Sequence, residues 1–389
     1  MTGGLRVVPA DPEDPAGAAA WDSLAGPDDF YLSAAWARAV ERMRPQRALH
    51  LAAVDDSGRP GGILPGYLID EGATSPFIRP DLVLGRLAAE RPEGAERPEG
   101  AGGVPGPELL PALGCGSRQV GQSRPLLASG PPGSGAGAAL IGASLERAAA
   151  RGARSVQFLY VDEDRHSLRR ALRAAGFTEF FSGWDCVLDT PWQDFGGYLR
   201  SRSAGRRKQV LRERRELADA AVSFRVARLD PRDADRLAVL EAAVHARYGN
   251  PVPAGAAAAR LRGLAGAMPG AFLIEARRDG QTLGFLVLLP WEDRLYVANY
   301  GLDRGAAGRL PAYFGLLFYE PISLAVTTGK VRLHYGLGST EAKTSRGCRR
   351  VAQYGYVHCF DPGLAARVRR LAASLPAPAG GGGNDGRGL

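Results

Sequence analysis

The feature that most constrains this chain is an element that occurs twice, once in each half of the sequence. Residues 145–161 (LERAAARGARSVQFLYV) and residues 322–337 (ISLAVTTGKVRLHYGL) both combine the end of a helix, a glycine turn and an apolar strand. Glycine just past the last helical residue is a common helix end, and apolar β-branched and aromatic runs favour strands. The repetition, in a chain of 389 residues, predicts two related α/β domains.

Further strands are expected around both elements. In the first half, His50–Val54 and Gly62–Ile69 flank a polar turn and predict a hairpin. In the second half, Phe272–Arg277, Leu283–Leu289 and Arg294–Tyr300 alternate with short turns. This spacing predicts an antiparallel meander of three strands. Each domain is therefore expected to hold a mixed, mostly antiparallel sheet flanked by helices.

Segments of biased composition suggest the domain edges. Residues 1–29 are acidic and proline-rich and predict a loosely held lead-in, before domains at residues 30–190 and 191–362. The region 85–137 contains the tandem repeat RPEGAERPEG, which cannot form a packed core, and predicts a partly disordered insertion. Residues 363–389 predict a helix followed by a disordered tail, PAPAGGGGNDGRGL.

Composition narrows the class of protein. No apolar run approaches the roughly 20 residues that a membrane-spanning helix needs, and the first residues lack the apolar segment of a signal peptide. The four cysteines and five histidines are scattered, so we expect neither a disulfide framework nor a metal site. A cytoplasmic protein is expected. The formal net charge of +8 favours an anionic partner.

The second of the two repeated elements continues into the most informative motif, YGLGSTEAKTSRGC at residues 335–348. Glu341, Lys343 and Arg346 follow a glycine turn at the end of a strand, which is a common way to place charged groups on a rigid scaffold. The chain has only three lysines among 49 basic residues. Lys343 is therefore a candidate catalytic group, because lysine differs from arginine as a compact charge that can lose its proton. The alternative is an ordinary surface lysine.

Three tyrosines are candidates for the lining of the same site. Tyr335 lies within the motif, Tyr300 ends the meander, and Tyr248 ends a predicted helix over residues 231–248. Together with Arg346, they are expected to contact substrate. For Tyr300 and Tyr335 the alternative is packing in the hydrophobic core, which is the commoner fate of an aromatic residue on a strand.

A strongly basic segment lies at residues 200–217. It contains eight cations and two acids, with Val210, Leu211 and Leu217 as an apolar side, and predicts an amphipathic helix. A solvated helix face is one interpretation. The other is a site for nucleic acid or for a phosphorylated small molecule. The candidate phosphate-binding residues are Arg206, Arg207, Lys208, Arg212 and Arg215.

The order of elements and the closing motif resemble a known family. Over roughly residues 30–362 the chain is similar to tandem GNAT-like acyltransferases of the FemABX-like and BioF2-like group, associated with peptidoglycan biosynthesis or recognition. The resemblance implies an α/β fold of two GNAT-like domains and an acyltransferase activity. Some members of the group take an aminoacyl group from charged tRNA, and others are described as acetyl-CoA-dependent. By resemblance, Lys343 occupies the position of the family's lysine near the acyl carbonyl.

The sequence bears on the choice of acyl donor. A GNAT domain that uses coenzyme A needs a loop of the form (Q/R)-x-x-G-x-(G/A), whose backbone amides wrap the pyrophosphate. Here the loop begins at Arg304, its fourth position is Ala307 instead of glycine, and Pro311 removes one more donor nearby. The loop departs from this pattern, and the chain also carries an intensely basic segment. Together these two features favour aminoacyl-tRNA as the acyl donor, and no further cofactor is expected.

The resulting hypothesis is an N-acyltransferase that forms an amide from aminoacyl-tRNA and the amine of a small molecule or peptide. The ester is already reactive, so alignment and oxyanion stabilisation suffice. Lys343 is expected to stabilise the oxyanion, and Glu341 to orient Lys343 or accept the amine proton. The alternatives are an acyl-CoA-dependent N-acetyltransferase and a non-catalytic nucleic-acid-binding protein. A monomer is expected.

Overall fold

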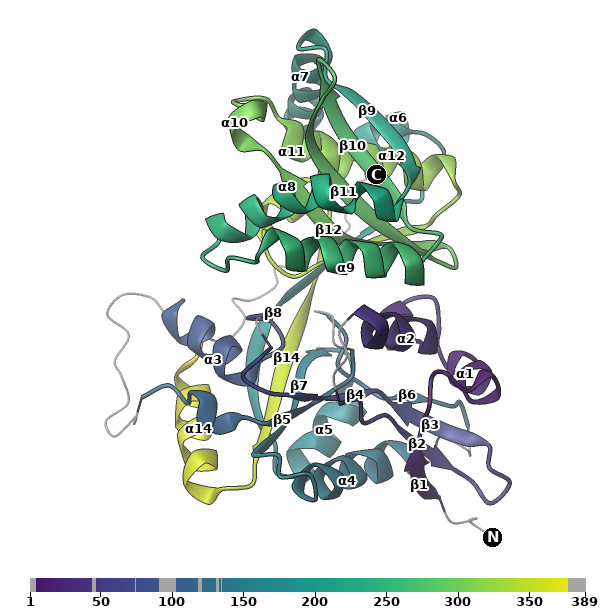
Figure 1. Ribbon diagram of the computed structural model, residues 1–389, viewed down its shortest axis with the longest axis vertical. Coiled ribbons are helices and arrows are strands. Elements are labelled where there is room, and N and C mark those ends of the chain that lie inside the picture. The colour runs from purple at the N-terminus through teal and green to yellow at the C-terminus, as the bar shows by residue number, and fades with distance from the viewer. Residues whose placement is uncertain are drawn as a thin grey trace. The chain divides into compact units, whose positions relative to one another are not determined.

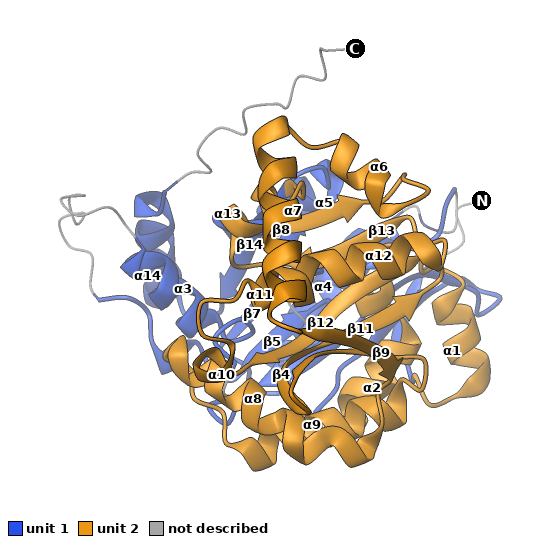
Figure 2. Cartoon of the chain, turned by 90° about the horizontal axis from the view of Figure 1, so that it is seen from above, with its two compact units in different colours: residues 1–11, 47–184, 351–389 blue, residues 12–46, 185–350 orange. Residues whose placement is uncertain are grey.

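The computed structural model describes residues 5–43, 47–73, 75–90, 103–117, 121–130, 133 and 135–376. They form two compact units, shown in Figure 2, each made of segments that are far apart in the sequence. Unit 1 comprises residues 1–11, 47–184 and 351–389, and unit 2 comprises residues 12–46 and 185–350. The repeat RPEGAERPEG and residues 377–389 of the predicted C-terminal tail lie outside the described residues.

Unit 1 combines two sheets with flanking helices (Figure 1). Its small sheet has the order β1 (Arg6–Pro9), β2 (Leu51–Val54), β3 (Pro60–Leu64) and β6 (Leu126–Leu127). Its larger sheet has the order β4 (Gly66–Ile69), β5 (Ala112–Cys115), β7 (Ser155–Asp162) and β14 (Arg349–Cys359), followed by β8 (Thr178–Asp189). The helices of this unit are α3 (Pro80–Ala89), α4 (Ala136–Ala149), α5 (His166–Ala174) and α14 (Pro362–Ser374).

Unit 2 is built on a sheet with the order β8, β13 (Arg332–Gly336), β12 (Arg294–Leu302), β11 (Gln281–Trp291), β10 (Phe272–Arg278) and β9 (Ser223–Arg228). The antiparallel meander expected at β10–β12 is confirmed. The α-helices of this unit are α1 (Pro15–Asp22), α2 (Ala34–Met43), α6 (Phe195–Arg200), α7 (Ala204–Asp219), α8 (Ala234–Arg247), α9 (Ala254–Ala267), α10 (Arg304–Ala307), α11 (Ala312–Phe314), α12 (Glu320–Thr327) and α13 (Thr340–Ser345).

One compositional prediction needs correction. The lead-in is not loose, because Arg6–Pro9 pairs with β2 and Pro15–Asp22 forms a helix that buries Trp21. Within the predicted insertion, Ala112–Cys115 forms a strand between β4 and β7, and partial disorder of this region stays a prediction. In both regions, short apolar runs paired with strands that are distant in sequence.

The division into units also differs from the predicted boundaries. Residues 12–46 belong to unit 2, while β14 returns to unit 1 and pairs antiparallel with β7. Residues 12–46 are attached to the rest of unit 2 by polar as well as hydrophobic contacts. Asp28 accepts hydrogen bonds from Arg294 Nε at 2.8 Å and Arg332 Nη1 at 2.8 Å, and its carboxylate lies 3.0 Å from His334 Nε2.

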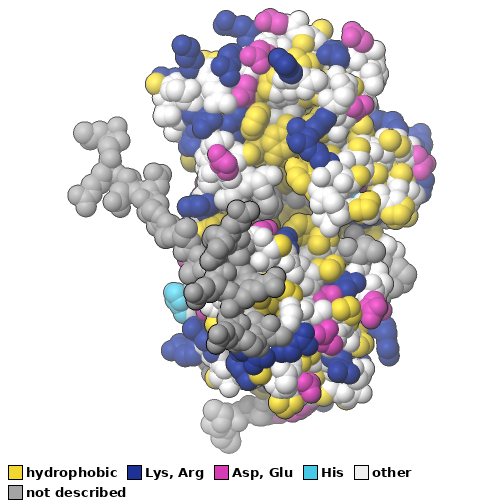
Figure 3. All heavy atoms as spheres, turned by 90° about the vertical axis from the view of Figure 1, so that its left-hand side faces the viewer, with side chains coloured by type: hydrophobic (Ala, Val, Ile, Leu, Met, Phe, Trp, Pro, Cys, Tyr) yellow, Lys and Arg dark blue, Asp and Glu magenta, His cyan; other side chains and the backbone are white. Residues whose placement is uncertain are grey.

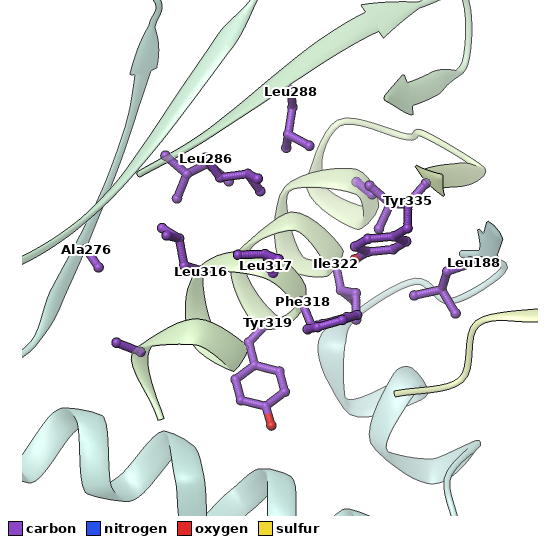
Figure 4. Close-up of a cluster of buried hydrophobic side chains, with 14 of the residues drawn as sticks. Leu188, Ala276, Leu286, Leu288, Leu316, Leu317, Phe318, Tyr319, Ile322 and Tyr335 are labelled. Atoms are coloured by element: carbon purple, nitrogen blue, oxygen red, sulfur yellow. The ribbon is translucent and has the colours of Figure 1, made fainter. Parts of the chain in front are cut away.

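The core of unit 2 lies between its sheet and the long helical segment that follows β12. Figure 4 shows leucine side chains of β11 facing Leu316, Leu317 and neighbouring residues of this segment. Residues Gly315–Tyr319 form a π-helical turn between α11 and α12. The wider turn leaves Phe318 and Tyr319 both buried, with Phe318 stacked on Tyr335 at a centroid separation of 5.1 Å.

The end of β12 is irregular, and this irregularity shapes the site. Leu286 of β11 faces Tyr300, whereas Leu288 faces Val297, so β12 carries one extra residue in a bulge. The parallel pairing of β12 with β13 stops at Tyr296 and His334, although both strands continue. Gly301 lets α8 approach β12 closely, because a Cβ atom there would lie 2.7 Å from the backbone nitrogen of Glu241.

We predict that Asp28→Asn makes the protein less stable at neutral pH and removes part of its acid sensitivity. Burial alone would raise the pKa of Asp28, but hydrogen bonds from His334 and Arg294 lower it well below its usual value. The carboxylate therefore stabilises the fold above about pH 4 and loses this effect as the pH falls further. Because the side chain is 38% exposed, we expect a loss of about 1 kcal/mol.

The measurement is urea unfolding of both proteins at pH 7 and at pH 3. The difference in free energy of unfolding between wild type and Asp28→Asn should be smaller at pH 3 than at pH 7. An equal difference at the two pH values would contradict the stabilising role of the Asp28 carboxylate. Asp56→Asn, in an exposed turn of unit 1, serves as the control.

Candidate functional site

Lys343 braces the glycine turn that follows β13. Its Nζ donates to the backbone carbonyls of Tyr335 at 2.8 Å, Gly336 at 2.8 Å and Leu337 at 2.7 Å. The side chain is only 5% exposed, and burial lowers its pKa. All three donors of the ammonium group are thus used within the protein. The oxyanion role expected for Lys343 stays a prediction, since it would require one of these carbonyls to be released.

The turn itself is held in an uncommon backbone conformation. Gly336 and Gly338 have φ values of 67° and 75°, and Ser339 has a φ of 48°. A non-glycine residue in this region costs energy and is often found at functional sites. Thr340–Ser345 then forms α13, which carries Glu341 in its first turn with an exposed side chain. The turn therefore presents Ser339 and Glu341 on a segment that Lys343 holds from within.

Arg346 lies in the core and pairs with an acid on the basic helix. Its guanidinium donates to both carboxylate oxygens of Glu213, at 3.0 and 2.8 Å, and its Nε donates to the Tyr319 hydroxyl at 3.2 Å. Both members of the pair are buried, at 1% and 5% exposure. The ring of Phe314 lies 3.8 Å from the guanidinium carbon. Arg346 thus ties α13 to α7, which differs from the substrate contact expected from the sequence.

Tyr335 also packs into the core, as the alternative interpretation proposed. Figure 4 shows its ring close to Phe318 and Ile322. Burial raises its pKa strongly, and its hydroxyl is buried without a hydrogen-bond partner among the described residues. Tyr335 therefore supports the turn as part of the hydrophobic core.

Tyr248 and Tyr300 come together at a pocket of about 420 Å³ in unit 2. One face of α8 and the end of β12 form its walls, and the start of α10 closes one side. Figure 3 shows the corresponding side of the molecule, where hydrophobic side chains gather beside Lys and Arg side chains. The pocket is lined by Val239, Leu240, Ala243, Val244, Arg247, Tyr248, Tyr300, Leu302, Asp303, Arg304 and Gly305.

Tyr313, which the sequence analysis did not single out, connects this pocket to the braced turn. Its ring contacts that of Tyr300 at a centroid distance of 6.3 Å. Burial raises the pKa of the Tyr313 hydroxyl, the nearby Ser339 side chain lowers it, and Tyr248 raises it further. Burial also raises the pKa of Tyr300, and the neighbouring Tyr248 acts in the same direction. No sequence pattern indicated a role for Tyr313, because a single tyrosine in an apolar helix is typical of a residue in the hydrophobic core.

The basic segment forms α7 and presents its charges to solvent. Val210, Glu213 and Leu217 are the buried residues of this helix. The predicted phosphate ligands Arg207, Lys208, Arg212 and Arg215 are exposed. Arg206 is half-buried and donates to Gln209 at 2.6 Å, and Gln209 donates in turn to Glu213 at 2.7 Å. A chain of polar contacts therefore joins the surface of α7 to the Glu213–Arg346 pair.

Comparison with known proteins places these features in a family. The model of a FemAB-like family, described as peptidoglycan biosynthesis/recognition, matches residues 120–375, which is more than half of the chain. The chain belongs to this FemAB-like family. The match includes α7, the pocket and the braced turn. No curated protein matches the chain.

Solved structures show the same fold at low sequence identity. FemX aligns with a TM-score of 0.60 and 12% identity, over 94% of this chain and 100% of that one. A tandem GNAT protein from the clavulanic acid biosynthesis pathway aligns with a TM-score of 0.55 and 14% identity, over 92% and 99%. L-PGS from Bacillus licheniformis aligns with a TM-score of 0.54 and 11% identity, over 94% and 98%.

The tandem GNAT fold expected from the sequence is therefore confirmed, and this FemAB-like protein is an acyltransferase. Within the described part of the chain, no helix combines the length and apolar character that crossing a bilayer requires.

We predict that Lys343→Met lowers the free energy of unfolding by about 2 kcal/mol, because it leaves carbonyls at the strand end without a donor. The matched control is Lys330→Met, since the Lys330 ammonium donates to a single backbone carbonyl, that of Glu292, at the surface. That variant should change stability by less than about 0.5 kcal/mol. Urea unfolding measures both. A Lys343→Met protein of unchanged stability would show that the ammonium does not brace the turn.

Glu213→Gln should destabilise the protein by about 3 kcal/mol, because Arg346 would keep its charge in the core without a counter-ion. Glu216→Gln is the matched control on the same helix. Glu216 is exposed and pairs with Arg212 at 3.4 Å, an arrangement worth about 0.3–0.5 kcal/mol. Equal unfolding midpoints for the two variants in urea would contradict the importance of the buried pair.

Proposed function

We propose that this FemAB-like protein transfers an aminoacyl group from aminoacyl-tRNA to the amine of a small molecule or peptide. The acceptor nitrogen attacks the ester carbonyl, a C–N bond forms, and the bond to the ribose oxygen breaks. The proton lost by the amine balances the one gained by the departing ribose oxygen. The observation that carries the proposal is the exposed cationic surface of α7.

The charges of α7 are arranged as a surface for a polyanion. With 3.6 residues per turn, Lys208, Arg212 and Arg215 lie opposite the buried residues of the helix. Arg207 and Arg214 flank them, and Arg214 rests on the Phe195 ring at 4.4 Å. Closely spaced exposed cations repel one another, which costs stability unless an anion binds across them. A phosphate backbone offers charges at a comparable spacing.

The loop after β12 supports a donor other than coenzyme A. The carboxylate of Asp303 accepts a hydrogen bond from the amide of Ala306 at 2.9 Å, so an anion already caps α10. Three more amides of this loop bond to carbonyls within it, those of Ala307, Gly308 and Leu310. Few donors remain to wrap a pyrophosphate, and Pro311 supplies none. The acyl donor is therefore better held through α7.

The site can promote aminolysis mainly by positioning. An aminoacyl ester is activated already, so binding both reactants in a near-attack geometry supplies much of the rate enhancement. Glu341 is exposed beside the turn, where it would accept the proton of the attacking amine. In this proposal Lys343 and Arg346 keep the turn and α13 fixed relative to α7. The donor's polar backbone and its reacting ester are then held by connected elements.

The proposal is tested with a total pool of charged tRNA and a mixture of candidate amines, followed by mass spectrometry. New amides should form with intact tRNA and should disappear after ribonuclease treatment. Product formation from acetyl-CoA in place of tRNA, with saturable coenzyme A binding by calorimetry, would overturn it. Binding of tRNA without transfer to any amine would overturn the catalytic part.

We predict that Lys208→Gln/Arg215→Gln weakens tRNA binding and lowers the slope of log affinity against log salt by about 1 for each side chain removed. Arg232→Gln/Arg262→Gln removes the same charge from unit 2. Both arginines there are paired, with Asp230 and Asp235. This control should leave the slope unchanged. Filter binding between 50 and 200 mM salt, about the range over which such contacts weaken, measures both. Equal slopes for the two variants would exclude α7 as the tRNA-binding surface.

A further inference from the structure

Arg202 carries a half-buried guanidinium that pairs with no acid among the residues the structure describes. It lies between α6 and α7 in the chain, with its guanidinium carbon 5.6 Å from the centre of the Tyr198 ring. It also crosses the end of α13, where a Cβ atom on Gly347 would overlap with Arg202 Nη1. Within the described chain, the one hydrogen bond of its side chain joins Nε to the Ser201 hydroxyl at 3.3 Å. The half-buried Arg294, in contrast, pairs with a carboxylate at 2.8 Å.

Arg206 supplies a second such cation from the inner side of α7. With 3.6 residues per turn, position 206 falls on the same stripe as Val210 and Glu213, which are buried residues of this helix. Lys208 lies about 200° away around the helix axis, on the opposite side. The Arg206 side chain is half-buried and bonds to the amide oxygen of Gln209, and no acid of the described residues pairs with it. The sequence analysis grouped Arg206 with the outer cations of α7, but the fold turns it inward.

Three guanidiniums near Tyr198 share a single carboxylate. Burial raises the pKa of Tyr198 to about 12. The charges of Arg202, Arg346 and Arg206 oppose this rise, so all three lie near its hydroxyl. Glu213 pairs with Arg346 at 2.8 Å, and no other acid that the structure describes is within ion-pair distance of the three. Half-buried cations without counter-ions repel one another and cost stability, which a bound anion would recover.

We propose that Arg202 and Arg206 bind an oxyanion, a carboxylate or a phosphate, at one end of the acyl acceptor. The planar fork of arginine matches both groups and can donate two parallel hydrogen bonds to either. The pair lies at the end of α13, whereas Glu341, which would take the amine proton, lies in the first turn of this helix. This inference rests on the proposed transfer to an amine. It adds that the amine belongs to a molecule with a negative charge at its other end.

The length of α13 sets the size of this acyl acceptor. The six residues of the helix rise about 9 Å along its axis, at about 1.5 Å per residue. An extended tripeptide spans about 10 Å. A molecule of this length can present its amine to Glu341 while its oxyanion reaches Arg202. The outer cations of α7 remain available to the acyl donor, because they lie on the opposite side of that helix from Arg206.

The experiment measures binding without any acyl donor, through the stabilisation that a ligand confers on the folded full-length protein. Triglycine is the probe, and triglycinamide, which lacks the negative charge, is its matched control. Triglycine should raise the melting temperature of wild type, and triglycinamide should need an about tenfold higher concentration for the same shift. Arg202→Gln/Arg206→Gln should abolish this difference. Arg232→Gln/Arg262→Gln, which removes the same charge elsewhere in unit 2, should retain it. Inorganic phosphate at constant ionic strength should compete with triglycine.

Stability without the probe separates this role from a structural one. If Arg202 served only to cap the end of α13, Arg202→Gln would lower the melting temperature in every buffer. A guanidinium without a counter-ion has little to lose, so we expect Arg202→Gln to match wild type until triglycine is added.

Transfer kinetics give a further readout. In Arg202→Gln/Arg206→Gln, the KM for triglycine should rise about tenfold, while kcat stays within about twofold of wild type. Binding far from the reacting atoms is lost equally from the ground state and the transition state, so its loss raises KM alone.

Several results would overturn the inference. These are equal melting-temperature shifts with triglycine and triglycinamide in wild type, an undiminished difference in Arg202→Gln/Arg206→Gln, and a destabilised Arg202→Gln protein in the absence of the probe. If Arg202→Gln/Arg206→Gln instead lowers the salt dependence of tRNA binding, as expected for Lys208→Gln/Arg215→Gln, the pair belongs to the acyl donor.

Failure of this inference is distinguishable from failure of the proposed function. If wild type transfers aminoacyl groups from tRNA and uses triglycine and triglycinamide with equal KM, the inference falls and the function stands. If wild type transfers nothing from tRNA while the melting temperatures behave as expected, the oxyanion site stands and the proposed function falls.

Discussion

The arrangement of unit 2 depends on burying two cations that lie three residues apart in sequence, Lys343 and Arg346. Lys343 satisfies three backbone carbonyls, and Arg346 neutralises Glu213. A buried charge is tolerated only when it is paired or fully hydrogen-bonded, so each of these side chains allows a single position for α13. The strained turn at Ser339 can persist because its surroundings are fixed on both sides.

The buried Glu213–Arg346 pair links the exposed surface of α7 to the interior of unit 2. Glu213 lies on the inner face of α7, whose outer face carries the exposed cations, and it binds Arg346 at the end of α13. Gln209 and Arg206 extend the contacts outward. A ligand on α7 would therefore act on a helix that is already part of the site's frame. No movement is needed for the two regions to be coupled, because they share the same buried carboxylate.

The pocket between α8 and β12 depends on a different structural feature, the irregular end of β12. The bulge before Tyr300 and the loss of pairing with β13 separate the strand ends, while Gly301 admits α8 at close range. Tyr300 and Tyr248 both line the pocket that results. A regular strand with a larger residue at position 301 would move α8 outward. The apolar walls and the tyrosine pair thus follow from backbone geometry more than from the residues themselves.

The sequence by itself determined the class of fold, the meander, the basic helix and the family, since apolar periodicity, glycine turns and charge density are local properties. It also identified Tyr248 and Tyr300, which the structure brings to one pocket. Only the tertiary structure decided that Lys343, Arg346 and Tyr335 face inward, and that Tyr313 joins the pocket to the turn. The burial of a charged side chain depends on partners distant in sequence, here Glu213, and no local pattern specifies them.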